Sequence, residues 1–147
     1  MPRVVSASRV IRADAAVIFD HIADPAKQLL WDGNDNLGQV LDGQRVTAVG
    51  QRFTMDLTHG AGARDNEVVE FEEGRRIAWL PGDVGRPRAG HLWRWELEPV
   101  DGGILVTHTY DWTRLDPDDA RRNKRASRTT DENLAASIRR LAALVEP

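Results

Sequence analysis

Residues 91–112 constrain the fold more than any other stretch of the chain, because they predict two strands joined by a tight turn. Side chains in a strand alternate between two faces, so His91, Trp93 and Trp95 share one face, with charged and aliphatic residues on the other. The Asp-Gly-Gly sequence at 101–103 supplies the positive φ angles of a tight antiparallel turn. The returning segment 104–112 places a second set on the aromatic face: Ile104, Val106, His108, Tyr110 and Trp112. The stretch therefore predicts a hairpin with one apolar face and one wet face.

The apolar face of this hairpin contains histidine and tyrosine as well as tryptophan. A protein core without a cavity favours residues that have no polar atoms. Large rings with single polar tips suit a ligand cavity, since they supply bulk for burial and a few groups for orientation. The alternative is that every ring belongs to the core and every polar tip bonds to backbone.

The rest of the chain predicts a strand, two short helices, a run of strands and a helical end. The first strand covers 4–11, and the two helices cover 15–23, behind Asp14, and 26–31, after Pro25. Asp116 and Pro117 are expected to begin the helical end, and a possible capping box at Thr129-x-x-Glu132 leaves open one helix or two. The strands expected between these regions cover 39–46, 51–58, 66–72 and 76–81.

Composition narrows the functional classes. A chain of 147 residues fits a single domain over 1–147, and the absence of cysteine excludes disulfides and thiolate chemistry. A net charge of -3 argues against nucleic-acid binding. Without an apolar run long enough to cross a bilayer or a signal-like start, the sequence predicts a cytoplasmic protein with no membrane insertion.

The order of these elements predicts an α+β fold, in which a curved antiparallel sheet of about six to seven strands wraps around a long C-terminal helix. This is a helix-grip fold with two short helices after the first strand. The chain resembles the START-like, Bet v 1-like (SRPBCC) superfamily, and within it the bacterial polyketide cyclase/dehydrase-like group. The resemblance covers nearly the whole chain and is carried by Ile11-x-Ala13-x-x-x-x-Ile18-Phe19 with Ala23-Asp24-Pro25, Val49-Gly50-x-Arg52-Phe53, Arg76-Ile-Ala-Trp79, and Trp93-x-Trp95-x-Leu97-x-Pro99 followed by Gly103-x-x-Val106-Thr107.

Candidate site residues follow from the faces of the predicted elements. Histidine can exchange protons near neutral pH, so His108, Tyr110 and His91 are the catalytic candidates if the protein is an enzyme, with Asp32 as a minor one. The spacing of the histidines fits no metal-binding motif, and neither a metal nor another cofactor is expected. The basic run 121–128 is expected to be the exposed face of a helix, with an anionic ligand or partner as the alternative. The expected ligand-binding residues are Trp31, Phe53, Met55, Trp79, His91, Trp93, Trp95, His108, Tyr110, Trp112, Leu134 and Ile138.

Two functions compete at this point. The first is binding of a hydrophobic, lipid-like or aromatic molecule. The sequence favours it because large rings with polar tips are present, whereas no well-specified acid-base pair is. The second is implied by the resemblance: a cyclase, aromatase or dehydrase that folds a poly-β-keto chain while a cavity histidine or tyrosine shuttles protons. A stress-response or toxin-partner protein without turnover is a third possibility. The ligand's identity is open, and the protein is expected to be a monomer or a homodimer.

Overall fold

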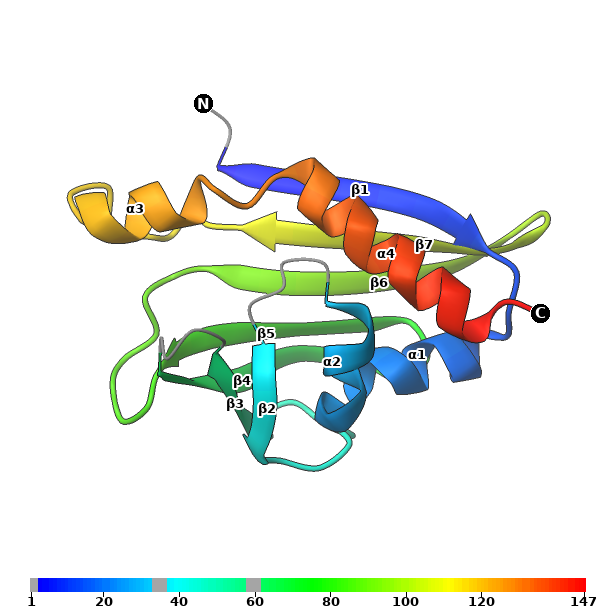
Figure 1. Ribbon diagram of the computed structural model, residues 1–147, viewed down its shortest axis with the longest axis horizontal. Coiled ribbons are helices and arrows are strands. Elements are labelled where there is room, and N and C mark those ends of the chain that lie inside the picture. The colour runs from blue at the N-terminus through cyan, green and yellow to red at the C-terminus, as the bar shows by residue number, and fades with distance from the viewer. Residues whose placement is uncertain (1–2, 33–36, 58–61) are drawn as a thin grey trace.

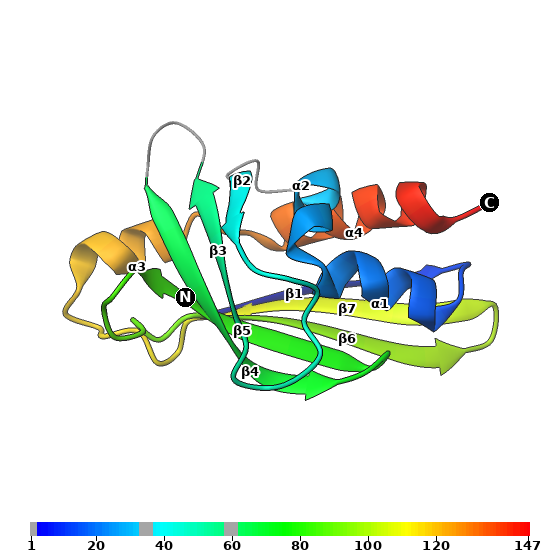
Figure 2. The same ribbon diagram turned by 90° about the horizontal axis from the view of Figure 1, so that it is seen from below.

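The computed structural model describes residues 3–32, 37–57 and 62–147, so the end of the strand expected over 51–58 lies outside it. One antiparallel sheet of seven strands has the order β1-β7-β6-β5-β4-β3-β2. Figures 1 and 2 show helices α1, α2 and α4 on one face of this curved sheet, with α3 near one end. The strands are β1 (Val4–Ile11), β2 (Leu37–Asp42), β3 (Arg52–Leu57), β4 (Ala63–Glu72), β5 (Arg76–Asp83), β6 (Leu92–Val100) and β7 (Gly103–Asp111), and the helices are α1 (Ala15–Ala23), α2 (Pro25–Trp31), α3 (Ala120–Ala126) and α4 (Asp131–Val145). The helix-grip architecture expected from the sequence is confirmed.

The hairpin of β6 and β7 has the register that the sequence predicts. Trp93 pairs with Tyr110 and Trp95 pairs with His108, so their rings share the concave face. On the outer face, Arg94 forms an ion pair of 2.6 Å with Glu70 of β4. The division into an aromatic face and a charged face is therefore confirmed.

Several predicted boundaries differ from the structure. β4 begins at Ala63 instead of residue 66, and β5 continues to Asp83 instead of ending at residue 81. The two extensions pair with each other, Arg64 opposite Asp83, so each strand supplies the hydrogen-bonding partner that the other lacks in isolation. β2 ends at Asp42, short of the strand predicted to reach residue 46.

The helical end is broken into two helices, the second of the two alternatives that the sequence allowed. α3 begins at Ala120, because Asp119, and not Asp116, accepts the capping hydrogen bond from the Arg122 amide. A capping box begins α4, but it is formed by Thr130 and Asn133 rather than by residues 129 and 132. None of the helices in the described ranges is long and apolar enough to cross a membrane.

We call the part of the concave face that α1 and α4 cover (Figures 1 and 2) the filled end. The larger hydrophobic cluster fills it and continues beyond it to Trp31 and Trp79. Three side chains of this cluster are each at most 1% exposed: Phe19 of α1, and Ile138 and Leu141 of α4. The same cluster includes Leu97 of β6 and Val106 of β7. Aliphatic side chains from two helices thus close one half of the curved sheet.

Candidate functional site

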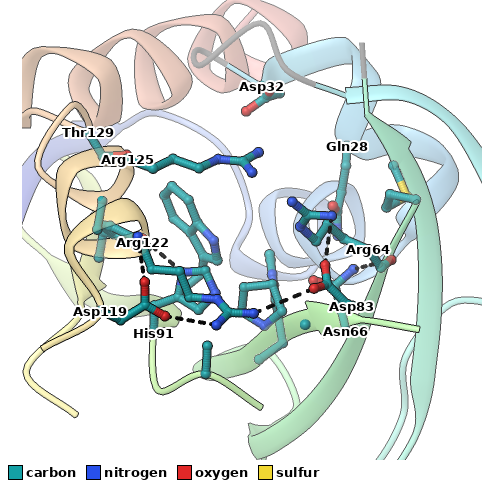
Figure 3. A pocket seen from close by; sticks show the side chains of 18 of the residues that line it. Gln28, Asp32, Arg64, Asn66, Asp83, His91, Asp119, Arg122, Arg125 and Thr129 are labelled. Atoms are coloured by element: carbon teal, nitrogen blue, oxygen red, sulfur yellow. Dashed lines mark hydrogen bonds and ion pairs between the residues drawn. The ribbon is translucent and has the colours of Figure 1, made fainter. Parts of the chain in front are cut away.

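A cavity of about 560 Å³ occupies the other half of the concave face, between the sheet and helices α2 and α3 (Figure 3). We call this region the hollow end. Four large rings line it, from α2, β5, β6 and β7: Trp31, Trp79, Trp93 and Tyr110. Met55 of β3 and Ala89, before β6, add apolar surface. The hollow end has the size of a small-molecule site, and its wall combines these rings with many polar and charged side chains.

The structure brings together seven of the residues that the sequence predicts for ligand binding. These wall residues are Trp31, Met55, Trp79, His91, Trp93, His108 and Tyr110. Asp32, the minor acid/base candidate, also lines the cavity. The alternation of side chains in β6 and β7 explains why several of them lie together, because their concave-face residues at the α3 end are side by side.

The other five predicted residues do not line the cavity. Trp95 is fully buried between the stacked His108 ring, 3.7 Å away, and the edge of Trp31, 5.1 Å away. Phe53 makes a T-shaped ring contact with the wall residue Trp79. Trp112 lies beneath the Arg3 guanidinium, and Leu134 and Ile138 of α4 are core residues. Their role in binding stays a prediction. Because they do not touch the cavity, they could affect a ligand only by positioning the wall residues.

His108 sits in a stack of rings between Trp93 and Trp95. Its Nδ1 lies 3.1 Å from the carbonyl oxygen of Arg94. Because a carbonyl can only accept, Nδ1 carries the proton of the neutral ring and Nε2 is the acceptor. Burial lowers the pKa of His108 to about 3. His108 is therefore a neutral, fixed ring at physiological pH.

His91 and Tyr110 form a polar pair inside the cavity, with 2.9 Å between His91 Nδ1 and the tyrosine hydroxyl. Burial lowers the pKa of His91 to about 4, and the positive charges of Arg64, Arg125 and Arg122 act in the same direction. Burial also raises the pKa of Tyr110. Both groups are neutral near pH 7, so they can exchange hydrogen bonds with a ligand but are a weak base and a weak acid.

Four arginine residues line the cavity, and none of them was among the predicted ligand-binding residues. Arg64 of β4 pairs with Asp83 at 3.1 Å, and Arg122 of α3 lies 3.5 Å from Asp83 and 2.9 Å from Asp119. The basic run lies on an exposed helix face, as expected, and Arg121, Arg122 and Arg125 of this run also line the cavity. Arg64 escaped notice because its strand was expected to begin at residue 66.

Two further observations concern a metal site and His21. Within the described ranges, no group of three histidine, aspartate or glutamate residues is arranged to hold a metal ion. His21 bonds through Nδ1 to the Val17 carbonyl of its own helix, outside the cavity. The hollow end thus combines aromatic rings, a neutral histidine-tyrosine pair, arginines and aspartates.

Comparisons with known proteins agree with this architecture. A protein from Chromobacterium violaceum has a TM-score of 0.69, with 19% identity and 99% of each chain covered. Ginseng major latex-like protein 151 from Panax ginseng has a TM-score of 0.64, with 15% identity and 98% of this chain and 97% of that chain covered. The Aha1 dimer from Colwellia psychrerythraea has a TM-score of 0.64, with 17% identity and 97% and 96% covered. At these identities the likeness concerns the fold alone.

The sequence itself was compared with protein families and with curated proteins. No curated protein matches the chain significantly. The sequence pattern of one family, described as polyketide cyclase / dehydrase and lipid transport, matches residues 2–146. A match over nearly every residue, together with the helix-grip fold, confirms the resemblance seen in the sequence: the chain belongs to the polyketide cyclase / dehydrase and lipid transport family.

Proposed function

We propose that the protein binds an apolar, aromatic or lipid-like small molecule in the hollow end. The observation that carries this proposal is the cavity of about 560 Å³ with a wall of four large rings. Sites for small molecules are commonly concave, mostly apolar and about 300–1,000 Å³ in volume. The family's description as including lipid transport supports the same class of ligand.

Polar groups of the cavity would orient the ligand rather than supply most of the binding free energy. His91 and Tyr110 already bond to each other at 2.9 Å and are neutral near pH 7. The rings of Trp79 and Trp93 offer flat apolar surfaces on which an aromatic or aliphatic body can lie. Affinity should therefore rise with the apolar area of the ligand, by roughly 25 cal/mol per Å² before ordering costs.

A cavity-filling substitution tests the proposal. Naphthylmethanol, a neutral aromatic alcohol, is titrated into the wild-type protein and into Ala89→Phe by isothermal titration calorimetry. Ala89 lies on the cavity wall, so a phenyl ring there should occupy part of the volume and weaken binding about tenfold or more. Val84→Phe is the matched control, because Val84 is 60% exposed in the same β5–β6 connection.

The two variants separate a ligand in the cavity from one on the surface. We expect Val84→Phe to bind like the wild type and Ala89→Phe to bind weakly, with both variants retaining the wild-type circular dichroism spectrum. Equal affinity in the two variants would place the ligand outside the hollow end. Absence of saturable binding of naphthylmethanol to the wild type would contradict the proposed function itself.

Proton-transfer catalysis, as in a polyketide cyclase or dehydrase, is a second candidate function, favoured by the contact between His91 and Tyr110 inside the cavity. A base whose pKa is about 4 is mostly deprotonated near pH 7 but accepts protons weakly, which is why binding is preferred. A poly-β-keto thioester tests this alternative. If His91 is the base, His91→Gln should still bind the thioester but lose turnover by about 10²–10⁴. Unchanged turnover would remove His91 from that role.

A further inference from the structure

We infer that the ligand of the hollow end carries a carboxylate, and that Arg125 binds this group at the mouth of the cavity. The inference rests on the proposed binding function and specifies its ligand as an apolar body with one acid group. Figure 3 shows the Arg125 side chain extending from α3 into the pocket, with Arg64 on the opposite side. Both residues line the same cavity as the rings of Trp79 and Trp93.

The ion pairs at the mouth distinguish Arg125 from its neighbours. Arg64 is engaged by Asp83, and Arg122 is engaged by Asp83 and Asp119. In the part of the chain that the structure describes, no carboxylate lies within ion-pair distance of Arg125. A guanidinium has five donors in a planar fork that matches a carboxylate, and those of Arg125 are directed into the pocket.

The charges around the cavity favour an anion. Four arginines and three aspartates line it, a net charge of +1, and Asp83 and Asp119 are already held by Arg64 and Arg122. The positive field reaches its interior, because the charge of Arg125 contributes to lowering the pKa of both Arg64 and His91. A carboxylate at the mouth would offset this repulsion while its apolar body lies on the rings below.

Exposed cationic side chains are often only solvated surface, and the position of Arg125 argues against that explanation here. Lys124 and Arg125 of α3 are both exposed, but only Arg125 also lines the cavity. The helix therefore separates one cation that faces solvent from another that faces the pocket. This pair supplies a matched comparison, since replacing either residue removes one positive charge from the same helix.

The test compares three ligands that share one naphthyl body: naphthoate, naphthylmethanol and naphthylmethylammonium. Calorimetric titrations are carried out with the wild-type protein, Arg125→Gln and Lys124→Gln. We expect the wild type to bind naphthoate about five- to tenfold more tightly than the alcohol, and to bind the ammonium ion weakest. Arg125→Gln should abolish the preference for naphthoate, so that the acid and the alcohol bind alike, while Lys124→Gln should keep the wild-type preference.

An NMR titration of His91 supplies a readout that does not depend on affinity. A carboxylate bound near Arg125 should raise the pKa of His91 from its value of about 4, and naphthylmethanol should not. Equal binding of the acid and the alcohol, with equal effects of the two substitutions, would overturn the inference while leaving the cavity as a binding site. Failure of all three ligands to bind would contradict the proposed function as well.

Discussion

The two ends of the concave face are built on the same strands and have opposite character. β6 and β7 carry Leu97 and Val106 at the filled end, in the same hydrophobic cluster as Ile138 and Leu141 of α4. Four residues before Leu97 on β6, Trp93 faces a cavity instead of a helix. The helix above each end makes the difference, because α4 supplies aliphatic side chains and α3 supplies arginines. An alternating strand thus defines the inner face but leaves open whether that face becomes core or cavity.

The largest expected effect concerns the filled end. Ile138→Ala removes a side chain that is 1% exposed, and should lower the free energy of unfolding by about 2–5 kcal/mol through lost burial and cavity formation. Urea denaturation measures this change. Leu144→Ala is the control on the same helix, because Leu144 is 42% exposed and should cost less than about 1 kcal/mol. Equal losses in the two variants would show that the filled end is not tightly packed.

Burial of the neutral His108 ring should make the free energy of unfolding depend on pH. His108 has a pKa of about 3 in the folded protein and 6.5 as its ordinary value, so the unfolded chain binds a proton first as the pH falls. Stability should therefore be full above about pH 7 and decline below the unfolded pKa, by roughly 2 kcal/mol at pH 5 from this residue. His108→Gln should show a flatter dependence in urea denaturation across this range. An identical slope in the variant would mean that His108 is not buried as a neutral ring.

The smallest of these effects is expected at the hollow end. Tyr110→Phe removes the hydroxyl that lies 2.9 Å from His91 Nδ1 and should cost about 0.5–1.5 kcal/mol in the free energy of unfolding. The cost is modest because the phenyl ring is retained and the polar atoms border a cavity. A loss as large as that of Ile138→Ala, measured in the same urea series, would erase the contrast between the two ends.

The sequence predicted the fold well because its strongest signals are periodic. The alternation through Trp93, Trp95, His108 and Tyr110 survives in the structure, since a register shift by one residue would put all four rings in water. Helix caps were predicted less accurately. Thr130 and Asn133 form the capping box of α4, and an asparagine in that role is a weaker signal than the glutamate at position 132.

The site was only partly predictable, because the sequence gives the face of a residue but not what covers it. Trp95 lies on the correct face, yet Trp31 from α2 packs over it and removes it from the cavity. Arg125 could not be placed without knowing where α3 begins, and that start depends on one hydrogen bond to Asp119. The position of a helix over a sheet depends on contacts between residues far apart in the sequence, which periodicity does not record.

The central claim is that the hollow end, and not the filled end, receives the ligand, and the indole N–H signals of the five tryptophans test it most directly. Proton-nitrogen correlation spectra are recorded while naphthylmethanol is added. We predict saturable shifts for Trp31, Trp79 and Trp93, which line the cavity, and smaller changes for Trp112, which packs against Arg3 and does not line it. Shifts of equal size at Trp112 and at the three wall residues, or no shift up to the solubility limit of the ligand, would contradict the account.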